Sequence, residues 1–360
     1  MKPAIRLAVV AHSGKTFGGG LPELRKVLAG AGHRQPIWCE VSKSSKAKKA
    51  VRRVLKKGAN LVFVWGGDGM VQKCIDQLAG TEVSLAIIPA GTANLLAGNL
   101  GIPKDIAQAV RVGLHSTPRT LDVGVVNGER FAVMAGTGFD ALMMRDVDAN
   151  QKEQMGRLAY LRSGIKAMQA RRVRVKIRVD GAVWFKGKIS CALLGNVGTV
   201  GGGLEVFPDA SPTDGMMEVG VVTANSPSQW LRVFSRLALG RVDRSPFVKT
   251  TRGKKIVVQL ERKTPFELDG GARPSTKRLK FRVEPGAINV CAPASVVANR
   301  SPRTKTSTKT STKVSTKAHT KTRPRRTVSP TPRTVEEEQV PAVPTERATQ
   351  NGAPSAGERP

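Results

Sequence analysis

The amino-acid sequence predicts an α/β domain, then an all-β sandwich domain, and finally a disordered basic tail. Three observations lead to this fold class. Strand and helix patterns alternate up to about residue 125, hairpin patterns follow up to about residue 284, and a Lys/Ser/Thr/Pro-rich segment fills residues 299–360. With 360 residues, of which 40% are hydrophobic, the chain is long enough to build two cores.

The α/β prediction comes from residues 1–125. Apolar runs typical of buried strands occur at Ile5–Ala11, Ile37–Val41, Leu61–Trp65 and Ser84–Ile88. Helical patterns occur at Leu21–Ala29, Ser45–Lys57, Val71–Leu78 and Ile106–Leu114. Because strands and helices alternate, we expect parallel strands joined by crossover helices. Ligands of such sheets bind beyond the carboxyl ends of the strands.

The sandwich prediction comes from residues 126–284. The stretch VRVKIRVDGAVWFKG, Val173–Gly187, alternates apolar and basic residues around Asp180-Gly181, a dipeptide typical of hairpin turns. Further strand-like runs occur at Ile189–Leu194, Met217–Val222, Ile256–Leu260, Pro265–Leu268 and Leu279–Val283, and helical patterns at Met155–Ala170 and Ser228–Leu239. A last apolar run, Ile288–Cys291, suggests that residues 285–298 return to the first domain.

The chain is strongly basic, with 59 Lys and Arg against 27 Asp and Glu and a formal net charge of +32. Between Arg300 and Arg333 there is no acidic residue, and the repeat KTSTKTSTKVSTK lacks large apolar side chains, so we expect this tail to be disordered. The rest of the chain is basic too, which favours contact with an anionic membrane surface or another polyanion. The sequence leaves a homodimer open, because it does not determine the oligomeric state.

The sequence contains no pattern for export or membrane insertion. The opening apolar run, Leu7–Ala11, is too short for a signal-peptide core, and no later stretch approaches the ~18 apolar residues of a membrane span. The cysteines form no CxxC pair, so we expect reduced thiols at Cys39, Cys74, Cys191 and Cys291. We therefore expect a cytoplasmic protein that meets the inner face of the membrane from its surface.

The stretch VFVWGGDGM places Gly66, Gly67 and Gly69 around Asp68, between a predicted strand and a predicted helix. Such a turn aims backbone N–H groups and the positive end of the helix at an approaching anion. Asp68 would repel a phosphate unless a cation lay between them. The turn therefore predicts a metal-bound nucleotide as ligand. A glycine turn that serves only backbone geometry is the plainer alternative.

Seven motifs follow one another along the chain: SGK (Ser13–Lys15), GGDG (Gly66–Gly69), PAGTANLLAGNLGIP (Pro89–Pro103), LDVG (Leu121–Gly124), KEQMGRLAYL (Lys152–Leu161), GNVGTVGGGLEVFPDASPTDGMMEV (Gly195–Val219) and ELDGG (Glu267–Gly271). In this order they resemble the diacylglycerol kinase catalytic family, soluble bacterial lipid kinases that are related to sphingosine kinases. The resemblance covers about residues 4–295. It implies a nucleotide-binding domain like those of NAD kinases and phosphofructokinases, joined to a β-sandwich, with ATP between them. It also implies transfer of the γ-phosphoryl group to the hydroxyl of diacylglycerol or a related lipid alcohol.

The resemblance implies roles for individual residues. The nucleotide-contacting turns match Ser13, Gly14, Gly66, Gly67, Asp68, Gly69, Gly91, Thr92 and Asn94. The catalytic positions match Lys15, a phosphate-binding lysine, Asp269, a general base, and Lys152, a basic residue before a G-x-x-A-Y segment. The Mg²⁺-binding carboxylates match Asp68, Asp214 and, through water, Asp122. ATP and Mg²⁺ are therefore the implied cofactors.

Several of these residues also have plainer interpretations. Asp122 and Asp214 suit helix caps or turns, and Asp269-Gly270-Gly271 suits an ordinary hairpin turn. Lys152 suits an exposed helix end. The ordered set of motifs favours the functional interpretation in each case.

The chain departs from the family pattern at four places. Met70 replaces the threonine of GGDGT, Leu95 replaces an acidic residue, and Gly271 replaces the glutamate of the DGE motif. Val10-Ala11 stands where Asn-Pro is common in the first turn. Because Asp68, Asp214 and Asp269 are kept, we favour an active kinase with an altered substrate preference. The sequence does not name the lipid.

The segment SPSQWLRVFSRLALGR predicts an amphipathic helix with two interpretations. Trp230, Phe234, Leu237 and Ala238 could share a face opposite Arg232 and Arg236. Such a helix could lie at a membrane interface or pack on the sandwich, and the second arrangement is the commoner one.

Two further functions compete with a lipid kinase. A kinase of soluble substrates, such as NAD kinase, shares GGDG but not the TANLLAGNLGIP stretch. A catalytically impaired protein could instead bind lipid or nucleic acid through its basic tail, with strong salt dependence. Removal of the residues after Arg300 distinguishes the kinase from the tail-dependent binding protein, because only a kinase keeps its turnover after truncation.

Overall fold

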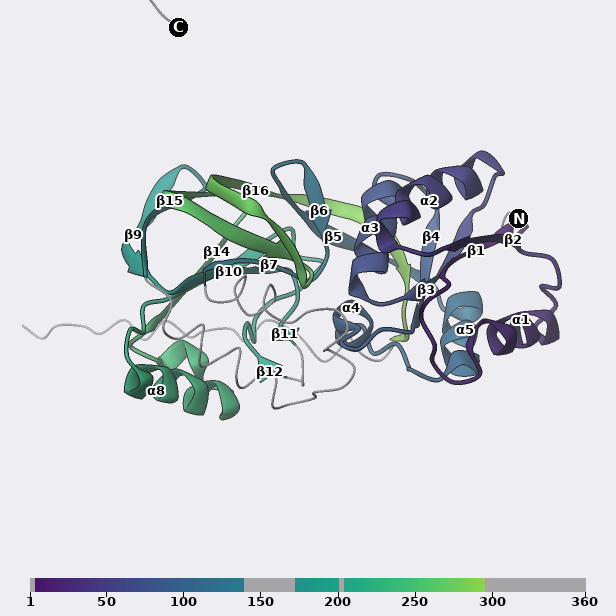
Figure 1. Cartoon of the computed structure of the whole chain (residues 1–360), viewed down its shortest axis with the longest axis horizontal. Coiled ribbons are helices and arrows are strands. Elements are labelled where there is room, and N and C mark those ends of the chain that lie inside the picture. The colour runs from purple at the N-terminus through teal and green to yellow at the C-terminus, as the bar shows by residue number, and fades with distance from the viewer. Residues whose placement is uncertain (1–3, 139–171, 201–203, 295–360) are drawn as a thin grey trace, which may run out of the picture. The chain divides into compact units, whose positions relative to one another are not determined.

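The computed structural model describes residues 4–138, 172–200 and 204–294, and the structural statements below refer to these ranges (Figure 1). An α/β part comes first in the chain and a β-sandwich follows, which confirms the predicted fold class. Lys152, the predicted helix Met155–Ala170 and the predicted tail of residues 299–360 lie outside the described residues.

The α/β part is built on a parallel sheet with the strand order β2-β1-β3-β4. The strands are β1 (Leu7–His12), β2 (Ile37–Val41), β3 (Leu61–Gly66) and β4 (Ser84–Pro89). The helices are α1 (Gly20–Gly30), η1 (Ser44–Lys46), α2 (Ala47–Lys56), α3 (Asp68–Leu78), α4 (Leu95–Asn99) and α5 (Ile106–His115). Helix α1 packs beside α5 and α2 packs beside α3, on opposite faces of the sheet (Figure 1). All residues of β3 are buried, because helices cover both of its faces.

The order of the strands determines where this sheet can bind a ligand. The chain passes from β1 to β2 on one side and then returns across the sheet to β3 and β4 on the other. A crevice forms where the direction reverses, beyond the carboxyl ends of the two central strands. These ends are His12 in β1 and Gly66 in β3. The GGDG turn therefore begins directly at the crevice.

The sandwich consists of two antiparallel layers that share two long strands, β15 and β16. Its strands are β5 (Pro118–Val126), β6 (Glu129–Phe131), β7 (Met134–Gly138), β8 (Val173–Val179), β9 (Ala182–Ile189), β10 (Cys191–Gly195), β13 (Met217–Val222), β14 (Val248–Gly253), β15 (Lys255–Leu268) and β16 (Gly271–Cys291). Residues 256–260 of β15 pair with β8, whereas residues 266–268 pair with β7. Irregular register between Gln259 and Phe266 lets β15 pass from one layer to the other. The two strand-like runs predicted here are thus one strand.

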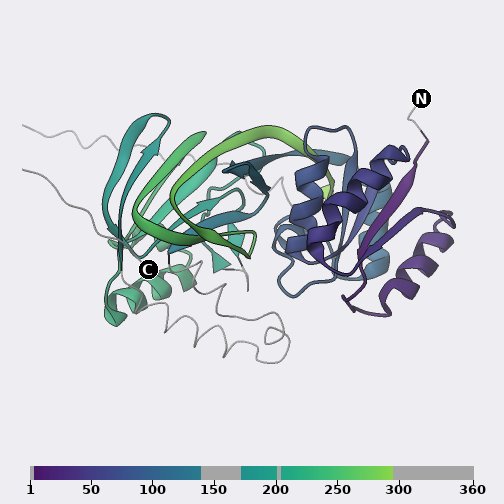
Figure 2. The ribbon, with the colours of Figure 1, turned by 45° about the horizontal axis from the view of Figure 1, so that its top comes forward.

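Strand β16 joins the sandwich to the parallel sheet. It pairs antiparallel with β15 and β5, and then parallel with β4 through Asn289 and Val290. Figure 2 shows this strand curving from the sandwich toward the helices of the α/β part. The runs Leu279–Val283 and Ile288–Cys291 both belong to it.

The predicted hairpin at Asp180-Gly181 is confirmed. Asp180 has φ of 48° and Gly181 has φ of 91°, so both lie in the left-handed region that a two-residue hairpin turn requires. Strand β8 alternates buried Val173, Val175 and Ile177 with basic residues on the outer side. The buried side faces the core between the two layers.

Helix α8 (Pro227–Ala238) covers the outer side of the layer that contains β10 and β13. It lies next to the short strand β12 (Leu204–Glu205) and the short helix η3 (Val242–Arg244), and β12 pairs with the short strand β11 (Thr199–Val200). The hydroxyl of Ser226 caps it by accepting a hydrogen bond from the N–H of Gln229 at 3.4 Å. Trp230 and Val233 are buried against Cys191 and Ala224. The packed interpretation of this helix is therefore confirmed for its inner side. None of the described helices is both long and apolar enough to cross a bilayer.

Candidate active site

A cavity of about 490 Å³ has a polar end and an apolar end. The polar end is lined by residues at or after the ends of β1, β2, β3 and β4 together with the β15–β16 turn. These residues are His12, Lys15, Ser44, Gly67, Asp68, Gly69, Gly91, Thr92, Glu267 and Asp269. The apolar end is lined by the sandwich and α8: Cys191, Leu193, Phe207, Val222, Trp230, Val233, Leu237 and Val248 among others. One continuous cavity therefore connects the glycine turns to an apolar compartment between the sandwich and α8.

Two glycine turns, one containing Gly67 and the other Gly91, contact each other through their backbones at the polar end. A Cβ atom on Gly91 would lie 2.4 Å from the Cα of Gly67, so only glycine allows this approach. Asn94 holds the second turn: its Oδ1 accepts from the N–H of Gly91 at 2.9 Å, and its Nδ2 donates to the carbonyl of Gly91 at 2.6 Å. Asn94 has φ of 49° and is buried, so it shapes the turn rather than lining the cavity. Gly66 also lies behind the lining, because Met70 packs where its side chain would be.

Asp68 is the first residue of α3 and connects the two turns. Its Oδ1 accepts a hydrogen bond from the N–H of Leu95 at 2.6 Å. Burial raises the pKa of Asp68, and backbone N–H groups of the second turn, led by that of Leu95, partly offset this effect. A carboxylate that is hard to ionise in the free protein would gain from a cation in the cavity.

The first turn follows β1. The N–H of Lys15 donates to the carbonyl of His12 at 3.1 Å, and Nε1 of Trp65 donates to the carbonyl of Lys15 at 3.0 Å. Burial and then the charge of Lys15 lower the pKa of His12, so its imidazole is neutral near neutral pH. The N–H of Gly14 donates to Nδ1 of His12 at 3.2 Å. Ser13 turns away and bonds to the carbonyl of Val41.

Asp269 lies at the turn between β15 and β16, with φ of 46°. Its carboxylate accepts three backbone hydrogen bonds of 2.9 Å, from the N–H groups of Ala132, Val133 and Met134. The pKa of Asp269 is raised to about 6: burial is the largest cause, the three N–H groups oppose the shift, and the nearby charge of Asp68 adds to it. A pKa near the working pH suits a general base. Asp269 is therefore a turn residue, and its role as a general base stays a prediction.

Asp122 and Asp214 lie near each other but do not line the cavity. Both oxygens of Asp122 accept backbone N–H groups, from Gly286 at 2.8 Å and from Gly215 at 2.6 Å. Asp214 accepts from the N–H of Met216 at 2.9 Å. Burial raises the pKa of Asp214, and Met216 and Arg252 oppose that shift. No group of three or more His, Cys, Asp or Glu side chains within the described ranges is arranged to hold a metal.

Comparison with known proteins decides the family. Residues 6–126 match the diacylglycerol kinase catalytic domain, and residues 133–292 match the YegS C-terminal NAD kinase beta sandwich-like domain. A diacylglycerol kinase of Bacillus subtilis (strain 168) is 30% identical over 228 residues, which cover 62% of this chain and 75% of that protein. The chain belongs to the diacylglycerol kinase family. This family is one of lipid kinases, which confirms the prediction of a kinase.

Other relatives agree with this membership. A diacylglycerol kinase of Mycobacterium tuberculosis (strain ATCC 25618 / H37Rv) is 30% identical over 220 residues, 59% of this chain and 71% of that protein. The crystal structure of a diacylglycerol kinase from Bacillus anthracis str. Sterne superposes with a TM-score of 0.67 at 23% identity, covering 81% of this chain and 98% of that one. At this identity the superposition supports the fold alone.

Two departures from the diacylglycerol kinase family pattern have a structural explanation. Met70 is buried, and a Cβ atom on Gly66 would lie 2.7 Å from the Cβ of Met70, so an apolar contact replaces the family's hydroxyl. A Cβ atom on Gly271 would lie 2.8 Å from a guanidinium nitrogen of Arg273. Arg273 therefore occupies space that a glutamate at position 271 would need.

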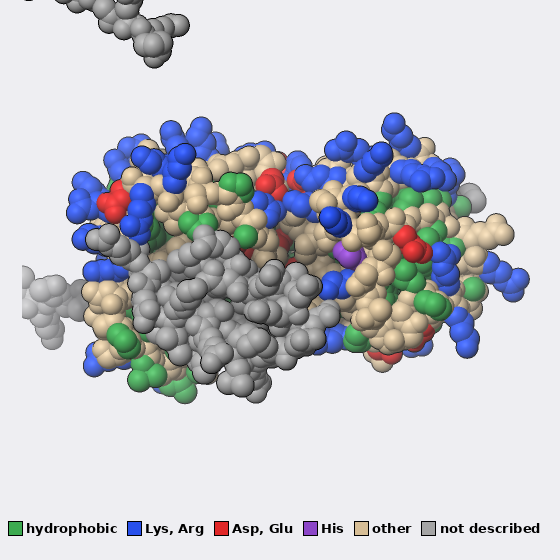
Figure 3. All heavy atoms as spheres, in the orientation of Figure 1, with side chains coloured by type: hydrophobic (Ala, Val, Ile, Leu, Met, Phe, Trp, Pro, Cys, Tyr) green, Lys and Arg blue, Asp and Glu red, His purple; other side chains and the backbone are tan. Residues whose placement is uncertain are grey.

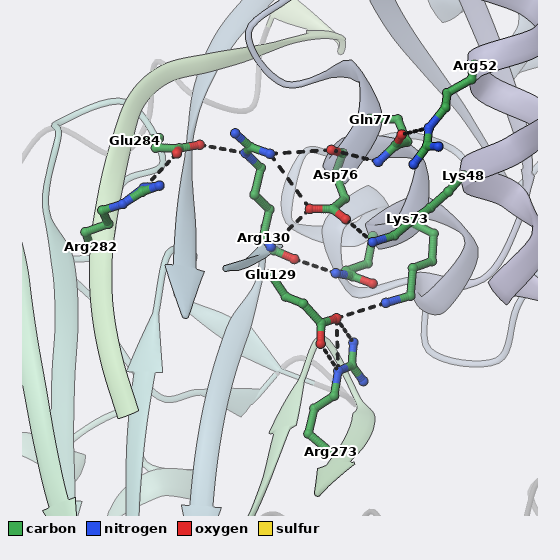
Figure 4. A network of polar contacts seen from close by, with 11 residues as sticks. Lys48, Arg52, Lys73, Asp76, Gln77, Glu129, Arg130, Arg273, Arg282 and Glu284 are labelled. Carbon is green, nitrogen blue, oxygen red and sulfur yellow. Dashed lines mark hydrogen bonds and ion pairs between the residues drawn. The ribbon is translucent and has the colours of Figure 1, made fainter. Parts of the chain in front are cut away.

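That arginine belongs to a polar cluster around Glu129, which connects α3 to the start of β16 (Figure 4). Arg273 donates to both oxygens of Glu129, and Nζ of Lys73 reaches the same carboxylate at 3.0 Å. Neighbouring Arg130 bonds to Glu284 at 2.6 Å and lies beside Asp76 of α3. Because α3 begins at Asp68 and β16 follows Asp269, this cluster supports the relative positions of the two carboxylates.

We expect Glu129→Gln to lower the free energy of unfolding by about 1 kcal/mol at neutral pH. Burial alone would raise the pKa of Glu129, but hydrogen bonds and charges from Arg273 and Lys73 lower it to about 2. A carboxyl with a depressed pKa stabilises the fold above its unfolded pKa and loses that effect as pH falls. The difference between parent and variant should therefore be complete above pH 4.5 and vanish as pH approaches 2.

Urea unfolding at a series of pH values checks this expectation. The matched control is Glu40→Gln. Glu40 forms a more exposed pair with Arg25 at 3.2 Å, and its hydrogen bond from Nε1 of Trp38 can be kept by the amide oxygen of glutamine. An exposed pair contributes little. Equal losses in the two variants would contradict the role given to the Glu129 cluster.

The structure brings together many of the residues predicted from sequence, but not all of them. Lys15, Gly67, Asp68, Gly69, Gly91, Thr92 and Asp269 line one cavity, whereas Ser13, Gly14, Gly66, Asn94, Asp122 and Asp214 do not. The sequence analysis missed His12, Ser44 and Glu267. Their positions at the ends of β1, β2 and β15 were the available signal. It also missed Asn196, whose Nδ2 donates to the carbonyls of Asp122 and Ala132 and so helps to fix the β6–β7 connection whose N–H groups Asp269 accepts.

Proposed function

We propose that this lipid kinase transfers the γ-phosphoryl group of ATP to the hydroxyl of diacylglycerol or a related lipid alcohol. The single observation that carries the proposal is the cavity that joins glycine turns and Asp269 to an apolar compartment. Phosphate groups suit the turns, whose missing side chains allow close approach to backbone N–H groups. Acyl chains suit the apolar end. A polar substrate such as NAD would leave that end without a partner.

In the proposed reaction, Asp269 accepts the proton of the lipid hydroxyl while the hydroxyl oxygen forms a bond to the γ-phosphorus. The bond between the γ-phosphorus and the β–γ bridging oxygen breaks, and ADP leaves with that electron pair. The chain mainly positions the reactants and neutralises charge. Lys15 and neutral His12 border the polar end and would bind phosphate oxygens, His12 by donating from Nε2.

The residues at the polar end fit a Mg²⁺ ion that arrives with the nucleotide. Asp68 and Asp269 are close enough for the charge of Asp68 to raise the pKa of Asp269, and a cation beside Asp68 would relieve this repulsion. Magnesium needs few protein ligands because it keeps waters and phosphate oxygens. When bound, it would neutralise phosphate charge. Asp122 and Asp214 stay predictions, since Asp122 already uses both oxygens to brace loops.

A phosphorylation assay tests the proposal. The purified full chain is given ATP and Mg²⁺ with diacylglycerol, monoacylglycerol, a long-chain amino alcohol or NAD, and lipid phosphate and ADP are measured. We expect turnover of at least one lipid alcohol and none of NAD, and a loss of about a hundredfold in Asp68→Ala. Turnover of NAD alone, or vesicle binding without any turnover, would overturn the proposed function.

A further inference from the structure

Exposed apolar side chains gather on the outer side of α8. Among the large hydrophobic residues that are exposed in the described ranges, Leu231 (70%), Phe234 (37%) and Leu239 (70%) lie on or directly after this helix. Single exposed leucines need no explanation. Leu231, Phe234 and Ala238 are spaced by three and four residues, however, and so form one stripe along the helix. Figure 3 shows hydrophobic side chains at the surface over α8.

Basic residues flank this stripe. Arg232 and Arg236 follow one side of the helix. Arg241 directly precedes the short helix η3, and Arg244 is its last residue. Between Ser226 and Ser245 the only acidic residue is Asp243. An apolar stripe bordered by arginines is the pattern of a helix that lies in a membrane interface, where apolar side chains enter the acyl boundary and arginines contact anionic headgroups.

The inner side of the same helix borders the apolar end of the cavity. Trp230, Val233 and Leu237 line that end, while Leu231 and Leu239 do not. Phe234 both lines the cavity and is partly exposed, and its ring stacks on Trp230 with centroids 5.4 Å apart. Helix α8 thus has one side on the apolar compartment and the opposite side at the surface.

We propose that the outer face of α8, formed by Leu231, Phe234, Ala238 and Leu239 with its flanking arginines, docks on an anionic lipid bilayer. The proposal rests on the proposed function, because a membrane is where a lipid alcohol would be found. Docking through α8 brings the apolar end of the cavity next to the bilayer. Nucleic acid would be a poor occupant, because the exposed leucines contribute nothing to phosphate binding.

A probe at one site tests this directly. Leu239→Cys in the full chain is labelled with an environment-sensitive fluorophore. Cys39, Cys74, Cys191 and Cys291 are all buried, and the parent chain treated in the same way reveals any label that reaches Cys191 through the cavity. The label is mixed with vesicles of phosphatidylcholine, with or without phosphatidylglycerol. We expect a blue shift with the anionic vesicles that weakens as salt is added.

The matched control is a label at Val183→Cys. Val183 is 51% exposed and lies on β9, in the other sandwich layer, beside the basic outer face of β8. We expect no blue shift there. A shift at position 183 without one at position 239 would place the bilayer on the basic sheet and overturn the proposal.

A second pair of variants separates docking from catalysis. Leu231→Glu/Leu239→Glu should bind anionic vesicles about tenfold more weakly, yet keep turnover of a short-chain, water-soluble lipid alcohol. Arg174→Glu/Arg178→Glu, on β8, should bind as the parent does. Unchanged vesicle binding by the leucine variant would overturn the inference even in an active kinase. A protein that docks through α8 but phosphorylates no lipid would instead overturn the proposed function alone.

Discussion

Replacing Asp269 with asparagine should lower kcat for lipid phosphorylation by about a hundredfold to ten-thousandfold, the usual contribution of a general base. The amide cannot accept the proton of the lipid hydroxyl. Binding of ATP, measured by calorimetry, should change little, because the substitution removes no residue of the glycine turns. A split between kcat and nucleotide affinity is therefore the expected result.

The pH profile of the parent gives an independent check of this role. Since burial raises the pKa of Asp269 to about 6, kcat/KM should fall as pH drops below about 6 and level off above it. The contribution of Asp269 to the stability of the fold depends on pH in the opposite direction to kcat/KM. A carboxyl whose folded pKa is raised stabilises the fold below its unfolded pKa of 3.8, and this contribution is lost as pH rises through about 6.

Asp180→Asn is the matched control for this substitution. Asp180 also has a positive φ, of 48°, and its carboxylate also accepts backbone N–H groups, from Lys254 and Lys255. It lies at the β8–β9 turn and does not line the cavity. Asp180→Asn should therefore cost stability while leaving kcat unchanged. Similar kcat losses in both variants would show that the Asp269 effect is only structural.

The second large effect is expected from Gly91→Ala. The new Cβ atom would lie 2.4 Å from the Cα of Gly67 and 2.9 Å from Oδ1 of Asn94, so the two turns must separate. Their N–H groups would then no longer converge on one ligand. A displacement of this order costs about a hundredfold in kcat/KM, and ATP affinity should fall with it.

Gly98→Ala is the control for that variant. Gly98 lies in α4, a few residues further along, and an added Cβ atom would meet nothing within 4 Å. Alanine also favours the helix by up to about 1 kcal/mol, so stability should rise slightly and kinetics should not change. Thermal unfolding and steady-state kinetics on both variants decide the matter. Normal kinetics in Gly91→Ala would contradict the contact between the turns.

Local patterns in the sequence predicted much of the fold. The α/β strands and helices follow from hydrophobic periodicity, and Ile37–Val41 agrees with β2 residue for residue. Other elements were missed or divided. Strand β7 (Met134–Gly138) consists of MAGTG, which has no strand-like alternation, and it forms because β10 and β15 pair with it on both sides. Pairing of that kind is decided by partners distant in sequence.

The candidate site shows the same division. The glycines, Asp68 and Asp269 were named from motifs, because a turn with positive φ or close backbone approach demands particular residues locally. The roles of Asn94 and Asp122 in holding loops were not predicted, because the sequence does not show which backbone groups a side chain will bond to. The position of His12 at the cavity was not predicted, because a single histidine outside any motif does not indicate a site.

The sequence by itself determined the order of the layers, the glycine turns and the family to which the chain belongs. Only the tertiary structure decided that Asp269 is gripped by residues 132–134, that Glu129 connects α3 to β16, and that the cavity has an apolar end beneath α8. The physical reason is the distance along the chain over which each effect acts. Propensity and turn geometry act over a few residues, whereas burial, pKa shifts and cavities arise where distant segments pack together.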